Sequence, residues 1–277
     1  MKPASFDLFQ PKNWQEVLEV LQEYGEDAQI LAGGQSLIAM LNMRIAKPKV
    51  LIDINSIEDD VPLIDNKTNI EISALFRQLQ LENRKKTKDD LPLISECLPY
   101  IGHQQHRARG TIIGSLCHAD PSSELPLCFI ALKGQLKLNS LSTQRIINAE
   151  DFFLGPLLNS RNHNEVIKSV IIPKAKEQTG YAFKEISEKH GDFALASFAA
   201  IASHNNVRFV VGGVSDKITA RDWITDDLNE IESLVNDFAW DLDTATDQYT
   251  TDRYKRDIIR NLGFETIKTA ISRKNAR

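Results

Sequence analysis

Residues 30–54 read ILAGGQSLIAMLNMRIAKPKVLIDI, and this stretch decides the fold class. Its start belongs to the apolar run 28–32, which has the length of a short buried strand and stops at Gly33-Gly34. A second apolar run, 50–54, follows Pro48 and predicts another strand. The order of strand, glycine turn, apolar segment and strand predicts a unit that mixes helices with strands.

The rest of the chain continues this mixture. Helical spacing of apolar residues predicts helices over 13–24, 75–82, 228–238 and 258–271. Strands are predicted over 69–73, 136–138, 166–172, 181–186, 194–203 and 207–214, although the alanine-rich 194–203 fits a helix equally well by pattern alone. The charged run 83–90 is predicted to be a solvated connection, with an insertion loop as the alternative. The predicted fold class is therefore α+β.

Composition excludes several classes of protein. The 277 residues are 42% hydrophobic, enough for a real core and for about two compact units. The net charge of −5 makes nucleic acid an unlikely partner. The opening MKPASFDLFQ lacks the apolar segment of a signal peptide, and no run of about 18 apolar residues predicts a membrane span. We expect a soluble cytoplasmic protein.

Cysteine and histidine spacing gives little support to a metal or cluster in this chain. Cys97, Cys117 and Cys128 form no CxxC pair, so a disulfide framework, a structural zinc site and an iron–sulfur cluster are not expected. The pair His103 and His106 has no carboxylate nearby at metal-ligand spacing.

Two glycine segments could hold phosphate. The chain has neither G-x-G-x-x-G nor G-x-x-x-x-G-K-[ST], which excludes the common dinucleotide and phosphate-loop fingerprints. Residues 32–37 (AGGQSL) and 111–115 (TIIGS) instead place glycine beside a hydroxyl side chain. Bare backbone N–H groups and a hydroxyl can converge there on phosphate oxygens. Each segment taken alone is more often an ordinary turn.

In their wider context these segments carry a family resemblance. Residues 30–54 and 101–127 (IGHQQHRARGTIIGSLCHADPSSELPL) resemble the FAD-binding subunits of molybdenum hydroxylases, the xanthine dehydrogenase and carbon monoxide dehydrogenase family. Further matches lie at 152–155, 165–173, 183–185, 191–194, 212–214 and 254–256. The resemblance spans nearly the whole chain.

The resemblance implies a fold of three subdomains, related to the vanillyl-alcohol-oxidase-like type. They are an N-terminal α/β FAD-binding part (1–57), a middle α+β FAD-binding part (58–175) and a C-terminal part (176–277). The C-terminal part is expected to hold a three-stranded antiparallel sheet with helices. FAD, bound non-covalently, is expected between the first two parts and in contact with the third.

The same resemblance assigns the contacts to FAD. The pyrophosphate is assigned to Ala32, Gly33, Gly34, Gln35, Ser36 and Leu37, together with Thr111, Ile113, Gly114 and Ser115. The flavin ring is assigned to Ile101 and Phe193 on its two faces, and to Asp192, Lys184 and the backbone around Ile167. Glu124 is expected near the ribityl or phosphate end, with His118 and Asp120 close by.

Each assignment has a plainer alternative. Lys184 fits a solvated strand residue, and Ile101 and Phe193 fit ordinary core positions. His118, Asp120 and Glu124 fit a loop network or a helix cap near Ser123.

The chain also departs from the family pattern at three places. Ile113 stands where the family usually has glycine, which requires a negative φ and a side chain turned away from the phosphates. Glu188 and Lys189 replace a frequent arginine pair, and the run 83–90 fits the pattern loosely.

The resemblance implies an oxidoreductase subunit that transfers electrons through FAD. A large molybdopterin-binding subunit would oxidise the substrate, and [2Fe-2S] clusters in a small subunit would deliver the electrons, in a heterotrimer or its dimer. The acceptor would be NAD, oxygen or a quinone. Two alternatives remain at this level: a self-contained flavin oxidase or dehydrogenase, which would need a substrate domain, and a non-catalytic module that has lost FAD, for which Ile113 is the only support.

Overall fold

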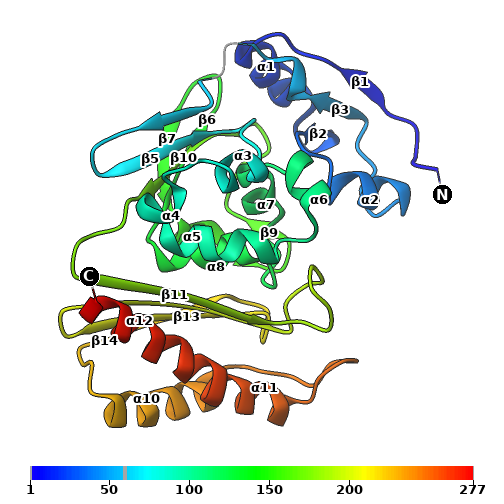
Figure 1. Ribbon diagram of the computed structural model, residues 1–277. Coiled ribbons are helices and arrows are strands. Elements are labelled where there is room, and N and C mark those ends of the chain that lie inside the picture. The colour runs from blue at the N-terminus through cyan, green and yellow to red at the C-terminus, as the bar shows by residue number, and fades with distance from the viewer. Residues whose placement is uncertain (1, 59–60, 277) are drawn as a thin grey trace.

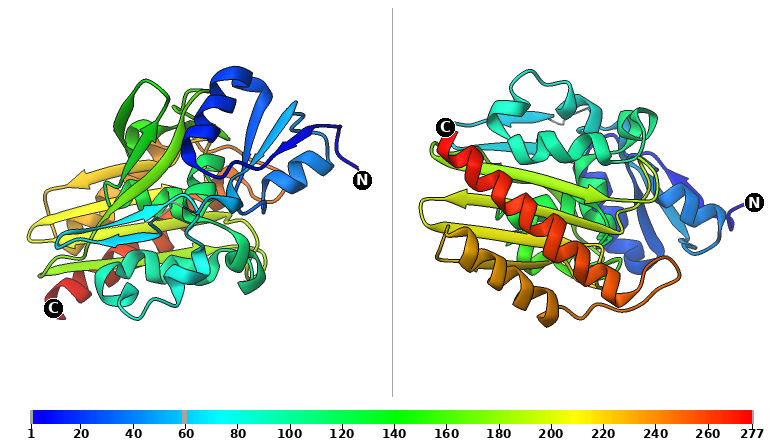
Figure 2. Two further views of the ribbon diagram at one scale, coloured as in Figure 1. Left: turned by 90° about the horizontal axis from the view of Figure 1, so that it is seen from above. Right: turned by 60° about the horizontal axis from the view of Figure 1, so that its bottom comes forward.

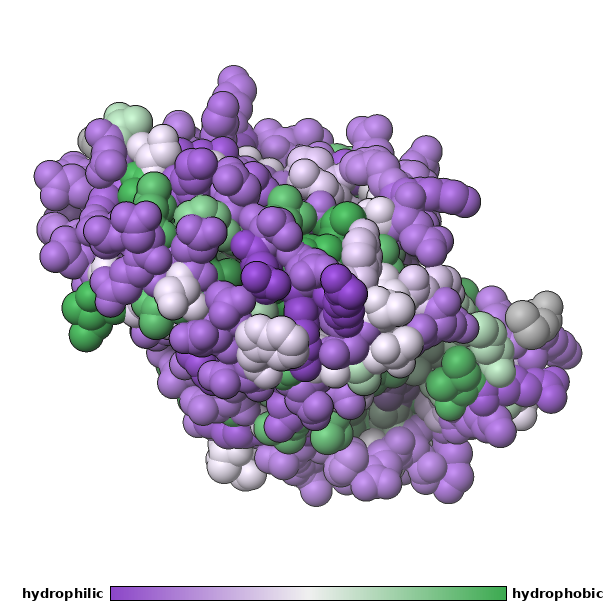
Figure 3. Space-filling model, turned by 90° about the horizontal axis from the view of Figure 1, so that it is seen from below, coloured by the Kyte–Doolittle hydropathy of each residue, from purple (hydrophilic) through white to green (hydrophobic). Residues whose placement is uncertain are grey.

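The computed structural model describes residues 2–58 and 61–276. Figure 1 shows three stacked units: the N-terminal unit at the top, a middle unit below it, and the C-terminal sheet with its helices at the bottom. Among the described residues, no helix has both the length and the apolar content needed to cross a bilayer. Figure 3 shows the lower face, which hydrophilic residues largely cover.

The N-terminal unit is a small parallel sheet with two helices. Strands β1 (Asp7–Phe9), β3 (Val50–Asp53) and β2 (Ala28–Leu31) pair in that order, and α1 (Trp14–Tyr24) and α2 (Leu37–Asn42) connect them. The Asn13 side chain accepts a hydrogen bond from the Glu16 backbone N–H and so starts α1. The predicted strands on either side of the glycine turn are confirmed, while β1 is too short and too exposed to show a pattern.

The middle unit is an antiparallel sheet covered by short helices. The strand order is β4 (Leu63–Asp65), β5 (Asn69–Ser73), β10 (Val166–Pro173), β6 (Gln135–Asn139) and β7 (Gln144–Asn148). The helices are α3 (Gln78–Glu82), α4 (Thr87–Asp90), α5 (Pro92–Cys97), α6 (Gln104–Arg109), α7 (Ile112–His118), α8 (Glu124–Ala131) and α9 (Ala149–Phe152). A two-stranded ribbon, β8 (Phe153–Gly155) with β9 (Leu158–Asn159), follows α9.

The charged run 83–90 is more ordered than a solvated connection. Its second half forms α4, in which Thr87 is buried and donates its hydroxyl hydrogen to the Leu81 carbonyl. Arg84 pairs with Asp65 and Asp90. The prediction of a solvated connection therefore holds for the exposed side chains of the run, but residues 87–90 form a short helix that ion pairs and one buried hydroxyl hold in place.

The C-terminal unit is an antiparallel sheet with helices on its lower face (Figure 2). Strands β11 (Thr179–Ile186), β12 (Ala196–Ser203), β13 (Asn206–Gly212) and β14 (Thr219–Trp223) pair in sequence, below which lie α10 (Leu228–Asp241), α11 (Asp252–Ile258) and α12 (Phe264–Ala276). The alanine-rich stretch is thus a strand. The structure adds a fourth strand, β14, to the three that were predicted. The sequence did not indicate β14 because it is a polar, half-exposed edge strand without apolar alternation.

Both faces of the C-terminal sheet are buried. Phe183, Ala199 and Val210 pack into the core of the upper units, whereas Ala182 and Phe198 pack into the core shared with the lower helices. Neighbouring residues of one strand therefore enter different cores. This alternation decides which residues of β11 face the middle unit.

Candidate functional site

A cavity of about 490 Å³ lies where the N-terminal turn, the middle helices and one loop of the C-terminal sheet meet. All the predicted cofactor contacts except Lys184 and Asp120 line it: Ala32, Gly33, Gly34, Gln35, Ser36, Leu37, Ile101, Thr111, Ile113, Gly114, Ser115, His118, Glu124, Ile167, Asp192 and Phe193. A volume of this size is typical of small-molecule and cofactor sites. Segments far apart in sequence are thus brought to one place, while the cofactor contacts themselves stay predictions.

The glycine turn after β2 exposes backbone N–H groups. Gly34 has φ +74°, a conformation that side chains rarely adopt, and a Cβ on Gly33 would lie 2.5 Å from the Arg109 carbonyl oxygen. Within the described parts of the chain, the backbone N–H groups of residues 33–37 donate no hydrogen bond. Five successive donors at the cavity wall can therefore bind a ligand's oxygens.

The second segment is fixed by a helix cap. The Thr111 hydroxyl accepts a hydrogen bond from the Gly114 N–H at 2.9 Å and starts α7. A Cβ on Gly114 would lie only 2.6 Å from this hydroxyl oxygen. Glycine is needed here because the cap and the chain come so close.

Ile113 meets the backbone condition that its departure from the family pattern imposes, and it also lines the cavity. It lies inside α7, where φ is negative, and it is 5% exposed within the upper core. A β-branched residue is therefore compatible with this loop.

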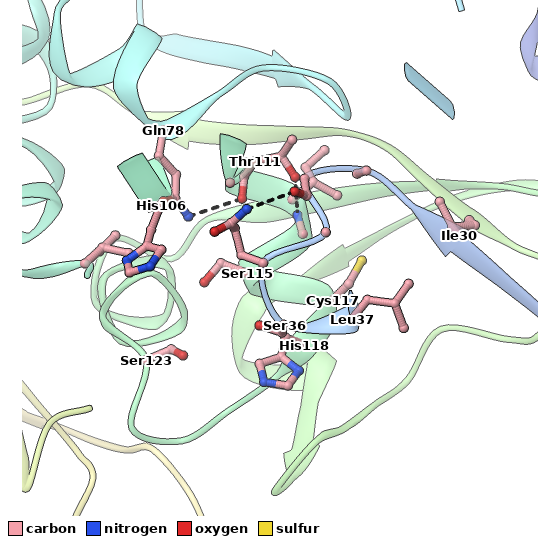
Figure 4. A pocket seen from close by; sticks show the side chains of 18 of the residues that line it. Ile30, Ser36, Leu37, Gln78, His106, Thr111, Ser115, Cys117, His118 and Ser123 are labelled. Carbon is pink, nitrogen blue, oxygen red and sulfur yellow. Dashed lines mark hydrogen bonds between the residues drawn. The ribbon is translucent and has the colours of Figure 1, made fainter. Parts of the chain in front are cut away.

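Gln78 joins the site although nothing in the sequence marked it. Its side chain Nε2 donates to the Thr111 carbonyl at 3.4 Å, and its backbone N–H donates to the Gly110 carbonyl. Figure 4 shows Gln78, Thr111 and Ser115 around one end of the cavity. Further lining residues that were not predicted are Gln29, Ile30, Met40, Ile54, Ala74, Gly102, His106, Gly110, Cys117, Ser123, Leu157, Arg161, Val166 and Gly191.

Phe193 lies at the mouth of the cavity. It is 67% exposed, on the loop between β11 and β12, so the alternative of an ordinary core residue is wrong. The loop bends at Gly191, which has φ +86° and where a Cβ would lie 3.0 Å from the Gly102 carbonyl carbon. Ile101, by contrast, is half-buried and packs against the upper core.

Asp120 and Glu124, the two acidic residues after α7, lie in different environments. The Asp120 carboxylate accepts from the Ser122 N–H at 2.8 Å and does not line the cavity, so the alternative of a local turn holds for it. Glu124, the first residue of α8, is buried at the cavity wall, and burial raises its pKa to about 7. Burial also lowers the pKa of His118.

Lys184 does not line the cavity, and neither does any other residue of β11. Phe183 and Glu185 lie on the face of β11 that packs against the middle unit, and Lys184 lies on the other face with Ala182. The contact of Lys184 with the cofactor stays a prediction, at a position turned away from the middle unit.

The residues present fit FAD. The unbonded N–H groups of 33–37 and the hydroxyl groups of Ser36 and Ser115 suit the pyrophosphate, and Ile101 with Phe193 provides apolar surface at the other part of the cavity. Among the described residues no cluster of three or more His, Cys, Asp or Glu side chains could hold a metal ion.

Comparison with known families matches residues 4–175 to the model described as "FAD binding domain in molybdopterin dehydrogenase". Among curated relatives, the 6-hydroxypseudooxynicotine dehydrogenase complex subunit alpha of Paenarthrobacter nicotinovorans is 37% identical over 203 residues, 73% of this chain and 69% of that protein. The glyceraldehyde dehydrogenase medium chain of Sulfolobus acidocaldarius is 30% identical and is covered over 99% of its length by 97% of this chain.

The solved structures agree with this similarity. A chain of carbon monoxide dehydrogenase from Hydrogenophaga pseudoflava superposes with a TM-score of 0.92 at 26% identity, over 99% of both chains. The reconstituted carbon monoxide dehydrogenase from Oligotropha carboxidovorans gives 0.90, over 99% of this chain and 100% of that one. The predicted α+β fold and the predicted family are confirmed.

Proposed function

Since this chain belongs to the family of the FAD-binding domain in molybdopterin dehydrogenases, we propose that it is the FAD-carrying electron-transfer subunit of a molybdenum hydroxylase complex. It takes electrons from [2Fe-2S] clusters of a small partner subunit and passes them to an external acceptor. The observation that carries the proposal is the meeting of the two glycine segments, 32–37 and 111–115, at one cavity.

The unbonded N–H groups of 33–37 bind the pyrophosphate, helped by the hydroxyl groups of Ser36 and Ser115. Ile101 and Phe193 enclose the flavin ring and exclude water from it, with Asp192 and the backbone of Ile167 at its edge. Glu124 and His118 hold the ribityl or phosphate end. Lys184 reaches the ring only if the end of β11 turns when the cofactor binds, and Asp120 acts by shaping the loop before α8.

FAD, when bound, supplies the chemistry: it accepts single electrons and passes on two. This chain binds and orients the cofactor and shields one part of it. The backbones of Gly191 and Gly102 approach closely, which keeps the loop that carries Phe193 at the mouth of the cavity, and an acceptor would approach the bound cofactor from this exposed side. NAD, oxygen and a quinone are the acceptors considered.

The other redox centres belong to partner chains in this proposal. Cys97 and Cys128 are buried in the core, and no cluster of ligands for a metal ion is found in the described residues. The molybdenum cofactor is therefore assigned to a large subunit and the [2Fe-2S] clusters to a small one, in a heterotrimer or its dimer. The subdomain limits at residues 57 and 175, and a cytoplasmic location, are parts of the same proposal.

A visible spectrum of the purified chain, followed by acid precipitation, tests the cofactor. Flavin absorbance that moves to the supernatant on precipitation supports non-covalent FAD. Colour that stays in the pellet contradicts it and favours the self-contained oxidase. An apoprotein that takes up no FAD on titration contradicts the proposed function altogether.

The partners are tested separately. The isolated chain, chemically reduced, is expected to reoxidise with an acceptor dye but to show no turnover with aldehyde, purine or N-heterocyclic substrates. Substrate turnover by this chain alone would contradict the assignment of the molybdenum site to a partner.

A further inference from the structure

The carboxyl group of Glu185 is buried on the face of β11 that meets the middle unit, without a hydrogen-bond partner. Both of its oxygens are inaccessible, and neither makes a hydrogen bond to any described residue. Ser197, directly opposite in β12, has a hydroxyl oxygen in the same condition. Directly opposed residues of an antiparallel pair share one face of the sheet, so the two groups lie together.

This face of the sheet packs against the helices of the middle unit. Helix α8 contacts β12 and β13, and its first residue, Glu124, lies at the cavity wall. Helix α5 contacts β11 and brings Cys97, which is fully buried. The charge of Glu124 acts on Glu185, both carboxyl groups act on the Cys97 thiol beside Cys128, and the Ser197 hydroxyl lies opposite in β12.

No cation among the described residues offsets Glu185. On α5, Glu96 is held by Arg273 of α12, which also donates to the Tyr181 carbonyl. Lys274 of α12 pairs with Asp226, and β12 carries no charged residue. Lys184 lies on the opposite face of β11.

An ionised carboxylate buried without a donor is unfavourable, and two of them side by side are more so. A protonated carboxyl needs only an acceptor, which a neighbouring carboxylate or hydroxyl provides. We propose that Glu124 and Glu185 hold one proton between them at neutral pH, and that Glu185 in this way limits the negative charge that Glu124 presents to the FAD cavity.

The pKa values of Glu124 and Glu185 are both raised, as expected for two buried carboxyl groups without a cation beside them. Burial, together with the charge of Glu124, raises the pKa of Glu185 to about 8. Burial raises the pKa of Glu124 to about 7, although a backbone hydrogen bond lowers it in part, and the charge of Asp120 has a smaller raising effect. The two groups interact, so the proton belongs to the pair.

The consequence for binding rests on the proposed function. FAD carries two negative phosphates into a cavity whose wall includes Glu124. A pair that keeps its proton adds one negative charge, and a fully ionised pair adds two. Glu185 is therefore a positioning residue, and we expect FAD affinity to fall as the pair ionises.

The first experiment measures the proton without the cofactor. Infrared difference spectra of the FAD-free full-length chain between pH 6 and pH 9 should show the carbonyl band of a protonated carboxylic acid, lost as the pH rises. In Glu185→Gln the band should be weaker and should be lost at a lower pH, near 7, because only Glu124 remains to hold a proton. Glu177→Gln, at an exposed site before β11, should leave it unchanged. No such band in the parent, or an unchanged band in Glu185→Gln, overturns the proposal.

The second experiment measures FAD affinity by flavin fluorescence from pH 6 to pH 9. We expect the Kd of the parent and of Glu177→Gln to rise about tenfold, the effect of one pKa unit of coupling. In Glu185→Gln the rise should be smaller and confined to the range around pH 7, because only Glu124 ionises. Equal slopes in all three proteins overturn the link to the cavity. An absence of FAD binding at any pH contradicts the proposed function instead, and the infrared band still decides whether the pair exists.

Discussion

Thr111 and Gly114 form a single unit at the start of α7: the hydroxyl of one accepts the backbone N–H of the other at 2.9 Å, and a Cβ on Gly114 would lie 2.6 Å from that oxygen. The cap thus depends on two residue types at once. It also fixes the loop that bears Ile113 and Ser115 at the cavity.

Thr111→Ala should lower the free energy of unfolding by about 0.5–2 kcal/mol, because α7 loses its cap. Thr111→Ser keeps the hydroxyl and should restore most of the loss. Urea unfolding of the three apoproteins measures it. If Thr111→Ala and Thr111→Ser prove equally stable, the hydroxyl does not contribute as a cap.

Gly34→Val should weaken FAD binding. A branched side chain at φ +74° costs on the order of 1–3 kcal/mol, and its Cβ would lie 3.0 Å from the Ile38 side chain. Since 1.4 kcal/mol is about a tenfold change in affinity, we expect a loss of about five- to 150-fold. Gly25→Val is the matched control, with φ +51° and no atom within 4 Å of its Cβ. Equal FAD affinity of the two variants would refute the role of residues 32–37.

Ile113→Gly tests the second segment in the opposite direction. It removes a buried side chain, so we expect a loss of about 2–5 kcal/mol in stability. FAD affinity, corrected for the fraction folded, should stay within a factor of three or improve, because glycine is the family's usual residue and the Ile113 side chain is almost fully buried. A large loss of affinity would show that the isoleucine contacts the cofactor.

Local patterns predicted most of the fold. The structure confirms the elements that a local pattern predicted. They are the capped helix at Asn13, the strands before and after Gly33-Gly34, and the strand over the apolar run 166–172. The edge strand β14 has no such pattern. It is held by backbone hydrogen bonds to β13, and its side chains are partly exposed to solvent, so they need not be apolar. The folded helix α4 depends on ion pairs with a distant strand, which no local pattern contains.

The candidate site was predictable where the ligand contacts come from backbone. Glycine and hydroxyl residues at 32–37 and 111–115 mark such contacts in the sequence itself. Gln78 and Leu157 reach the cavity only through tertiary packing, so no local sequence pattern around them predicts that they line the site. The direction of the Lys184 side chain depends on which face of β11 meets the middle unit, a property of the assembled layers.

The pH dependence of stability follows from the buried carboxyl groups. Glu185 has a pKa of about 8 in the folded chain and an ordinary value near 4.3 when unfolded, so between these values the folded chain holds a proton that the unfolded chain has released. Its contribution is fully present below about pH 4.3 and is lost as the pH rises through 8. The melting temperature of Glu185→Gln relative to the parent should therefore rise from pH 6 to pH 9. A difference that does not change with pH would show that Glu185 is ionised throughout.

Substitution of Phe193 distinguishes a role in contacting the cofactor from a role in stabilising the fold. Because it is 67% exposed, Phe193→Ala should change the stability of the apoprotein by no more than about 0.5 kcal/mol. If its ring packs on the flavin, the same substitution should weaken FAD binding several-fold, since an aromatic contact contributes about 0.5–1.5 kcal/mol beyond its area. Phe193→Tyr keeps the ring and should bind as the parent does. Trp240→Ala, a 63% exposed aromatic on α10, controls for removing any surface ring. Unchanged FAD affinity in Phe193→Ala would mean that the loop after β11 stays away from the cofactor.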